Sequence, residues 1–350
     1  MSGHEAIRWP ETGRILGAFV NGAIDIHGHA MPLSVLQWLG GEGLADLSQV
    51  PDRIVRIDAR VSGVGAGTPL PLAESMTSAA LRLVELDGLR LGAQAISLPP
   101  FLMASRSTDR DLVSEVTRRG NDALADYCGA DAQRLLPLGL VPVGWAHAVD
   151  EARRCLDELG MRGVAIGSRG ADLDLDAPVN DALWAFLSER KAFVFLHPSA
   201  VPDAGRLGDF WLPQLVGYPV ETAIAASRMV FAGRVRPDSF ALCLAHGGGC
   251  LPALRGRLDL GWERKEQART IDAPPSRVMR SLYFDTAVFD PVALRRLVED
   301  VGAGQVLVGT DHPFDLAERD PVGLVDAAGL DEADREAVLR GNAQRLLALA

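Results

Sequence analysis

Short apolar runs alternate with longer amphipathic segments along most of this chain, and this alternation limits the fold more than any other feature. Eight runs have the length and near-continuous apolar character of parallel strands that are covered on both faces. They are residues 23–29, 93–99, 134–142, 163–168, 192–198, 240–247, 281–287 and 305–313. Segments with a helical pattern lie between them, such as 114–129, 150–160 and 290–302.

Eight strands that alternate with helices in a chain of 350 residues predict an α/β fold, a (β/α)8 TIM barrel. The alternative is an open doubly wound sheet. That fold normally carries a Gly-rich phosphate loop after an early strand, but the sequence here is GHAMP (28–32). No internal repeat or linker divides the chain, so we expect a single domain over residues 1–350.

About twenty residues precede the first strand, and a long insertion, residues 31–92, separates the first strand from the second. The insertion contains GVGAGTPLP (63–71) and then a predicted helix near 72–91. Long loops at the mouth of a barrel are more often functional than disordered. We therefore expect this insertion to form a lid or a wall of the substrate site.

Charge and cysteine usage narrow the function classes. The chain has 35 Lys and Arg against 46 Asp and Glu, a formal net charge of −11, which argues against nucleic acid or an anionic membrane as a partner. No stretch of 18 apolar residues and no signal-peptide pattern at the N-terminus is found in the sequence. The four cysteines are scattered and form no CxxC pair, which is typical of reduced thiols in a cytoplasmic protein.

The first predicted strand carries an unusual group of polar residues, in the sequence IDIHGH (24–29). Side chains alternate along a strand, so Asp25, His27 and His29 are predicted on one face. Two imidazoles at this spacing can hold one metal ion through their neutral nitrogens. Taken alone, a pair of hydrogen-bonded structural histidines explains the pattern equally well.

Three other apolar runs end on groups that can bind a metal. His197 ends FVFLHP, His246 ends LCLAHGGG and Asp311 ends VLVGTDHP. Each of them alone reads as a core or capping residue. In a closed barrel, however, the carboxyl ends of the strands meet at one mouth. Four of the seven histidines and a carboxylate would gather there, which indicates a metal site.

The ligand types indicate which metal. Three His and one Asp without cysteine suit Zn2+, with Mn2+, Fe2+ or Co2+ as poorer fits. An open coordination position would activate water or polarise a substrate oxygen. Five candidate groups exceed what one such metal needs, so we assign His246 as an acid or base. The glycines 247–249 either bring backbone N–H groups to the site or only form a tight turn.

Several motifs, taken together, resemble a known family. They are IDIHGH, FLHP, FWLPQLVGYPVETAIA (210–225), AHGGGCLPALRGR (245–257), LYFDTAVFDP (282–291), GTDHPF (309–314) and GNAQRLL (341–347). In order and spacing the chain resembles the aminocarboxymuconate-semialdehyde decarboxylase branch of the amidohydrolase superfamily. The resemblance covers the first strand and nearly everything from residue 163 onward, and it implies an amidohydrolase-type barrel.

The resemblance implies roles for individual residues. His27, His29, His197 and Asp311 would bind a divalent metal, usually zinc, and Asp311 would thereby also take part in catalysis. His246 would be the catalytic base and acid beside the metal.

The resemblance also implies substrate contacts. Arg257 would reach the site of a neighbouring subunit and clamp a substrate carboxylate, which implies a homodimer or a higher oligomer. A second arginine is expected in the insertion, and Arg56 is the candidate, with Arg53 and Arg60 as rivals. Trp211 is retained from the family's aromatic pocket wall.

The chain departs from the family pattern at a few positions. Ser199 and Gln214 stand where tryptophans are expected, which alters the aromatic wall and predicts a different substrate. His312 replaces the Tyr often found in GTDYPF. Strand alternation points its side chain away from Asp311, so we expect it to pack or to support a ligand.

The function that the resemblance implies is metal-dependent, non-oxidative decarboxylation of a small unsaturated or aromatic carboxylic acid. A metal next to a phenol or enol stabilises the developing negative charge, and an imidazole can move the proton. The same groups also suit a hydrolase of a lactone, an amide or a C–C bond. A non-catalytic metal- or ligand-binding barrel is a third alternative, and the extra histidine argues against it.

Overall fold

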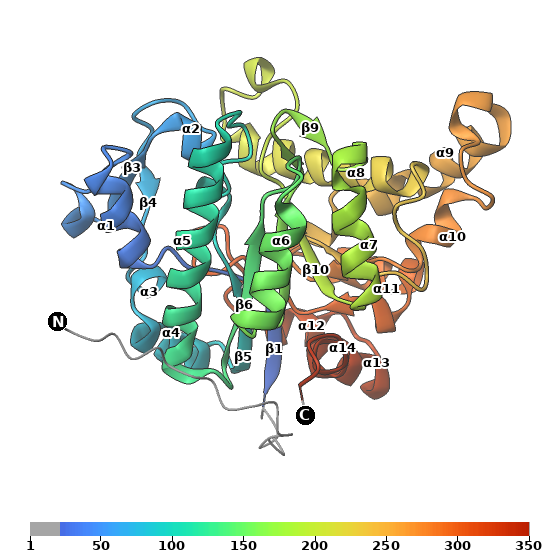
Figure 1. Cartoon of the computed structure of the whole chain (residues 1–350). Helices are drawn as coiled ribbons and strands as arrows, with labels where there is room; N and C mark the ends of the chain where they lie inside the picture. Colours follow the sequence, from blue (N-terminus) through green and yellow to red (C-terminus); the bar gives the residue numbers. More distant parts are fainter. Residues whose placement is uncertain (1–21, 350) are drawn as a thin grey trace.

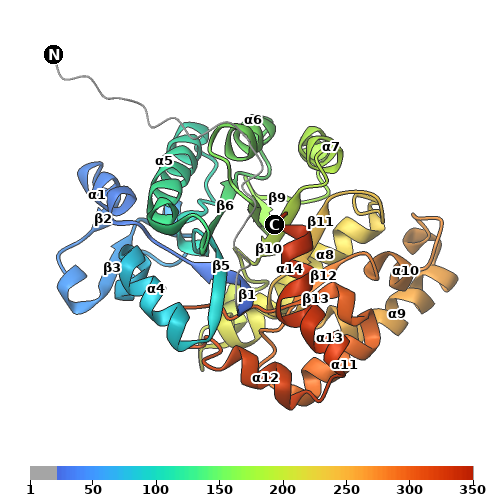
Figure 2. The same ribbon diagram turned by 90° about the horizontal axis from the view of Figure 1, so that it is seen from below.

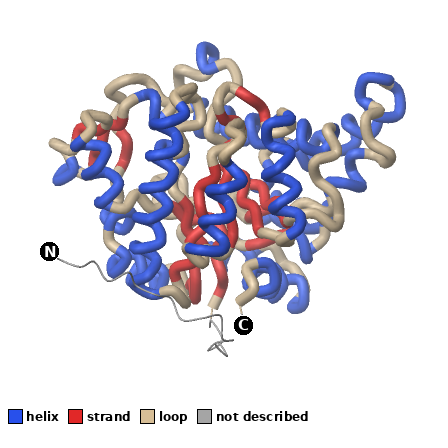
Figure 3. The backbone as a smooth tube through the Cα atoms, viewed as in Figure 1, coloured by secondary structure: helices blue, strands red, loops and turns tan. Residues whose placement is uncertain are grey.

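A ring of eight parallel strands forms the centre of the molecule, and helices surround it (Figures 1 and 3). The computed structural model describes residues 22–349. The predicted TIM barrel is confirmed, because each of the eight predicted runs contains or overlaps one strand. In spatial order they are β1 (Ala23–His29), β5 (Leu91–Ser97), β6 (Leu135–Val141), β7 (Gly163–Gly167), β10 (Phe193–His197), β11 (Ala241–Leu244), β12 (Tyr283–Asp285) and β13 (Val306–Leu307).

The outer helices follow the strands in the expected alternation. The predicted helical segments 114–129, 150–160 and 290–302 correspond to α5 (Arg110–Cys128), to α6 (Ala148–Arg153) with a following π-helical turn, and to α11 (Pro291–Val301). The helices after β5 are α5 (Arg110–Cys128), α6 (Ala148–Arg153), α7 (Asp181–Glu189), α8 (Tyr218–Phe231), α9 (Leu251–Arg264), α10 (Pro275–Met279), α11 (Pro291–Val301), α12 (Pro321–Ala327), α13 (Glu332–Glu336) and α14 (Asn342–Leu346). None of the helices within residues 22–349 combines the length and the apolarity needed to cross a bilayer.

The barrel closes where β1 meets the chain after β13. The amide of Ile26 donates to the carbonyl of Val308 (2.8 Å), and the amide of Asp311 donates to the carbonyl of His27 (2.9 Å). The amide of His29 donates in turn to the carbonyl of His312 (2.8 Å). We call this pairing of residues 26–29 with 308–312 the seam. It brings the two histidines of β1 next to Asp311.

Apolar side chains fill the interior of the barrel below the mouth. Alternate residues from seven strands form one buried cluster there, which explains why the strands read as apolar runs. Ala343 and Leu347, at the C-terminal end of the chain, belong to the same cluster, and α14 lies across the lower end of the barrel (Figure 2). The cluster comprises Ile24, Ile26, Ala93, Ala95, Leu136, Leu138, Ala165, Phe193, Phe195, Cys243, Ala245, Leu307, Ala343 and Leu347.

Strand β1 is irregular, and this changes one prediction. Its register against β5 shifts between Asp25 and Gly28, so that alternation is interrupted there. Ile24 and Ile26 face the interior below the shift, whereas His27 contacts the interior ring of Phe195 above it, at 4.8 Å between ring centroids. The prediction that Asp25 shares a face with the two histidines is therefore wrong.

The insertion between β1 and β5 is more structured than the sequence predicted. It contains α1 (Leu33–Gly41), a small antiparallel sheet of β2 (Ala45–Asp46), β3 (Ile54–Ile57) and β4 (Leu70–Pro71), and α2 (Ala59–Ser62). The helix predicted near 72–91 is divided into α3 (Glu74–Thr77) and α4 (Ala79–Gly88), because Ser78 is extended and caps α4. The segment before β1 lies outside the described residues except for Gly22.

Candidate metal centre and active site

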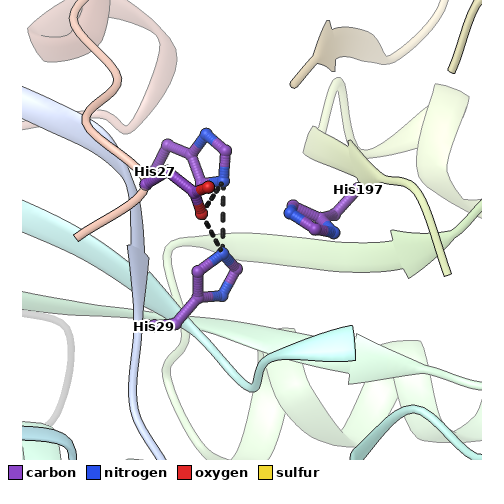
Figure 4. Close-up of side chains that lie close together, drawn as sticks. His27, His29 and His197 are labelled. Atoms are coloured by element: carbon purple, nitrogen blue, oxygen red, sulfur yellow. Dashed lines mark hydrogen bonds and ion pairs between the residues drawn. The ribbon is translucent and has the colours of Figure 1, made fainter. Parts of the chain in front are cut away.

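Four side chains converge at the carboxyl ends of the barrel strands. One ligand atom each from His27, His29, His197 and Asp311 lies within 4.8 Å of all the others. The three histidines are almost fully buried. Figure 4 shows His27 and His29 on the seam, with His197 facing them from β10. The structure thus brings together the four residues that the sequence predicted as metal ligands.

Hydrogen bonds define which ring nitrogens are free. His27 Nδ1 lies 2.7 Å from a carboxylate oxygen of Asp285, and His197 Nδ1 lies 2.9 Å from the carbonyl oxygen of Pro198. Because both partners are acceptors, each Nδ1 carries a proton, and Nε2 is the nitrogen left to coordinate a metal. His197 Nε2 and Asp311 Oδ1 are buried without a hydrogen-bond partner within residues 22–349. Such a set of acceptors is satisfied by a cation.

The spacing of these atoms fits a metal ion. His27 Nε2 and His29 Nε2 are 3.2 Å apart, and Asp311 Oδ1 lies 3.1 Å and 3.2 Å from them. Ligand atoms bound at about 2.1 Å to one ion stand about 3.0–3.4 Å apart in tetrahedral or octahedral geometry. The residues present therefore fit a divalent metal.

The electrostatics of the cluster favour positive charge. Burial lowers the pKa of His27, but the charge of Asp311 and the hydrogen bond with Asp285 outweigh it and raise this pKa to about 10. Burial lowers the pKa of His29 and of His197, so these two rings stay neutral and able to coordinate. A divalent cation would supply the charge that the two carboxylates stabilise.

Asp285 is a candidate functional residue that the sequence did not lead us to predict. One carboxylate oxygen accepts the Nδ1 proton of His27, and the other accepts from the amides of Gly247 (2.7 Å) and Ala287 (3.1 Å). It therefore orients a ligand and also fixes the turn that follows His246. The end of the strand in LYFD was the available signal, since Asp311 was found by the same rule.

His246 lies at the edge of the cluster. Its Nε2 is 3.6 Å from Asp311 Oδ2, the oxygen that does not face the other histidines, and its ring centroid is 5.3 Å from those of His27 and His197. His246 itself has a left-handed backbone (φ 57°). The four candidate ligands are thus complete without it, as its assignment to proton transfer requires.

The three glycines after His246 form a tight turn. The amide of Gly247 donates to Asp285, that of Gly248 to Ala245 and that of Gly249 to His246. None of the three amides is left over for a substrate. A Cβ on Gly249 would lie 1.8 Å from the carbonyl oxygen of Pro219, so close packing explains the glycine there. Of the two readings of GGG, the structure favours the turn.

Comparison with known proteins identifies the family. The amidohydrolase family model matches residues 24–349. The chain belongs to the amidohydrolase family. It is 31% identical over 274 residues to 2-amino-3-carboxymuconate-6-semialdehyde decarboxylase of Dictyostelium discoideum. The aligned residues cover 77% of this chain and 76% of the relative. This places it in the branch that the sequence motifs predicted.

A further relative agrees with this placement, and solved structures share the fold. Gamma-resorcylate decarboxylase of Rhizobium sp. (strain MTP-10005) is 26% identical over 289 residues, which cover 77% of this chain and 86% of the relative. The crystal structure of Metarhizium anisopliae IDCase in apo form superposes with a TM-score of 0.76 at 25% identity, covering 94% and 97% of the two chains. Dihydroxybenzoic acid decarboxylase of Polaromonas sp. JS666 shares the fold, with a TM-score of 0.74 at 22% identity over 94% and 97% of the chains.

The arginines predicted in the insertion of this amidohydrolase have partners away from the cluster. Arg56 donates to the side chain of Gln49 and to the carbonyl of Gly67. Arg53 pairs with Glu74 and Arg60 with Asp58. No hydrogen bond or ion pair within residues 22–349 joins any of the three to the candidate metal ligands, so the role of Arg56 stays a prediction.

Two residues predicted to bind substrate lie on the surface of the protein. Trp211 is 71% exposed, beside Phe210 at 83%, and both have left-handed backbones. Arg257 is exposed on α9 and makes no ion pair within the described part of the chain. Tyr218, which was not predicted as a site residue, lies closer to the histidine cluster, with its ring centroid 6.2 Å from that of His197. Burial raises the pKa of its phenol to about 12, so it remains a hydrogen-bond donor.

Asp285→Asn is expected to weaken metal binding roughly 10- to 100-fold, the usual cost of losing a partner that orients a ligand. The two backbone amides hold one oxygen of residue 285, so the new amide group would face His27 Nδ1. That group donates, which forces the proton of His27 onto Nε2 and removes a lone pair from the cluster. Chelator competition on the purified protein measures the affinity. Unchanged affinity would show that Asp285 supports only the turn.

Proposed function

We propose that this amidohydrolase is a divalent-metal-dependent, non-oxidative decarboxylase of a small aromatic or unsaturated carboxylic acid. The position of Asp311 carries the proposal. One of its oxygens lies 3.1 Å from His27 Nε2 and 3.2 Å from His29 Nε2, and the other faces His246 Nε2 at 3.6 Å. A metal site and a proton-transfer group would therefore share one carboxylate. The decarboxylases among its relatives support this class of reaction.

The reaction needs one proton transfer and no oxidant. The bond between the ring or alkene carbon and the carboxylate breaks, and CO2 leaves. The electron pair of that bond stays on the ring or alkene carbon, which takes up one proton. A bound divalent ion would supply electrostatic stabilisation of negative charge on a phenol or enol oxygen of the substrate. His246 would deliver the proton, with Nε2 held near Asp311.

Zinc is our proposal for the metal. Three imidazole nitrogens and one carboxylate oxygen suit Zn2+, and Mn2+ is the main competitor. The Polaromonas decarboxylase was crystallised with bound manganese, so both ions need to be tested. Metal analysis of the protein, purified without chelators or added metal, decides between them. Activity of the protein reconstituted with each ion shows which one supports turnover.

A substrate panel in D2O tests the proposed function. Suitable probes are 2,6-dihydroxybenzoate, 5-carboxyvanillate, 6-methylsalicylate and 2-amino-3-carboxymuconate 6-semialdehyde, the compounds after which its relatives are named. Turnover should release CO2 and place a single deuterium on the carbon that lost it. Opening of lactone or amide probes without release of CO2 would instead identify a hydrolase.

We also propose a homodimer or higher oligomer in which Arg257 enters the site of a neighbouring subunit. Four apolar side chains, Phe210, Trp211, Leu215 and Val216, are between 44% and 83% exposed just before or within the turn that leads into α8. An exposed apolar patch of this kind usually marks an interface. Helices α9 and α10 project from the barrel wall (Figure 1). They would carry Arg257 toward a second copy.

Arg257→Ala is expected to cut kcat/KM steeply while leaving the metal content unchanged. Truncating one partner of a buried charged pair costs roughly 2–5 kcal/mol, because the substrate carboxylate is left unpaired. Arg264→Ala, at the end of the same helix, is the matched control and should keep full activity.

Mixing chains tests whether Arg257 acts between subunits. Heterodimers of inactive His246→Asn and inactive Arg257→Ala chains contain one site that is wild type at both positions. Activity should return in that site. Heterodimers that form but stay inactive would show that Arg257 serves its own subunit or none.

A further inference from the structure

Arg82 is a fully buried arginine of α4, on the insertion side of the metal cluster. Its guanidinium has five N–H donors, and all of them find acceptors. Nη2 donates to the carbonyl of His29 and, with Nε, to the carbonyl of Ser75. Nη1 donates to Gln94 Oε1 (2.8 Å) and to His312 Nδ1 (3.1 Å). One side chain thus joins α3, β1, β5 and the loop after β13.

The charge of Arg82 is balanced at a distance. No carboxylate lies within ion-pair distance of it among residues 22–349. Gln94 accepts from Arg82 with its oxygen and donates to buried Asp25 with its nitrogen (2.7 Å). His312 likewise accepts from Arg82, and its other nitrogen lies 3.2 Å from Glu85. Two neutral side chains, Gln94 and His312, therefore connect the buried guanidinium to the carboxylates of Asp25 and Glu85.

Asp25 connects this network to both sides of the seam. Asp25 accepts hydrogen bonds from the hydroxyl (2.6 Å) and the amide (3.1 Å) of Thr310, the residue before ligand Asp311, and from the amide of ligand His27 (2.9 Å). Gly28 leaves room for the side chain of Gln94, since a Cβ on residue 28 would lie 2.4 Å from Cδ of Gln94. We call Arg82, Gln94, Asp25, Thr310 and His312 the polar anchor. It contacts both sides of the seam from behind the metal ligands.

We infer that Arg82 is a positioning residue that couples docking of the 31–92 insertion to retention of the metal. Three of the four candidate ligands, His27, His29 and Asp311, lie on the seam. The polar anchor sets the distance between β1 and the Asp311 loop, and Arg82 is the only member of the anchor that comes from the insertion. This inference rests on the metal site of the proposed function. Because linkage is reciprocal, a bound metal must then also stabilise α4 against opening.

Two variants and a control test the coupling. Arg82→Met keeps the length of the side chain and removes every donor, whereas Arg82→Lys keeps the charge and three donors. Arg90→Met, which removes the exposed pair with Asp320 just after α4, is the matched control. Metal affinity is measured by chelator competition with Zn2+ and Mn2+. Hydrogen exchange of the α3–α4 amides is measured with and without the metal.

The expected results separate coupling from simple folding defects. Arg82→Met should bind metal roughly 10- to 100-fold more weakly, with Arg82→Lys between it and wild type and Arg90→Met unchanged. In the wild type, metal should slow exchange of the α4 amides, and in Arg82→Met this protection should disappear. If Arg82→Met does not fold, Arg82→Lys and the wild-type exchange experiment decide.

The possible results overturn the two proposals separately. Wild-type protein that binds metal without any change in α4 exchange, or an Arg82→Lys protein with wild-type affinity and protection, would overturn the coupling and leave the decarboxylase proposal intact. Wild-type protein that binds neither ion would overturn the metal site itself.

Discussion

His197→Ala is expected to leave the purified protein without bound metal and without measurable turnover. The wild type should carry about one divalent ion per chain, held by three imidazoles and a carboxylate. Removing His197 takes away the ligand opposite the seam, and water cannot replace a buried imidazole without loss of affinity. His27→Ala should behave in the same way, because its Nε2 lies 3.2 Å from His29 Nε2 and 3.1 Å from Asp311 Oδ1.

His147→Ala is the matched control for this prediction. His147 lies just before α6 and bonds Ser114 rather than any member of the cluster, so its loss should leave the metal content unchanged. Metal analysis and circular dichroism are measured on the same preparations. A folded His197→Ala protein with full metal content would show that the cluster does not hold the ion.

Local pattern predicted the barrel because each strand is buried on both faces. The runs at 192–198 and 163–168 are apolar along their length, since one side of β10 and β7 fills the barrel and the other packs on helices. The candidate ligands were predictable for a related reason. An imidazole or carboxylate that ends such a run is conspicuous, and the topology of the barrel brings these ends together.

The register shift in β1 was not predictable from local pattern. IDIHGH alternates without a break, and only pairing with β5 shows that Asp25 turns away from His27. The strands of the 31–92 insertion were not predictable for a different reason. Its strands have two to four residues, too few to show a period. Asp285 ends its strand and could have been found.

Arg82 could not have been identified from its surroundings in the sequence. In AALRLVELDG it stands between apolar residues of a short helix, where an arginine is usually exposed. Its five hydrogen bonds go to four acceptors, which come from four separate parts of the chain. Only the folded structure shows that this charge is buried. Polar networks of this kind depend on tertiary contacts that no local periodicity encodes.

His246→Asn is expected to keep the metal while lowering kcat roughly 100- to 10,000-fold, the usual scale of general acid–base catalysis. Asparagine suits this position for a conformational reason. Residue 246 has φ 57°, and Asn is among the residues that adopt left-handed backbone most readily. The turn through Gly247 and its bond to Asp285 should therefore survive, so that the loss reports on the missing proton and not on the fold.

Exchange of the product with solvent gives a second measure of the same step. By microscopic reversibility, the group that protonates the carbon also removes that proton, so the wild type should exchange it for deuterium in D2O. His246→Asn should slow this exchange by a factor similar to its loss in kcat, while His147→Asn changes neither rate. A His246→Asn protein that loses its metal would instead make His246 a ligand. One that keeps its metal and full exchange would assign proton transfer to another group, with the phenol of Tyr218 the next to test, since its ring lies 6.2 Å from that of His197.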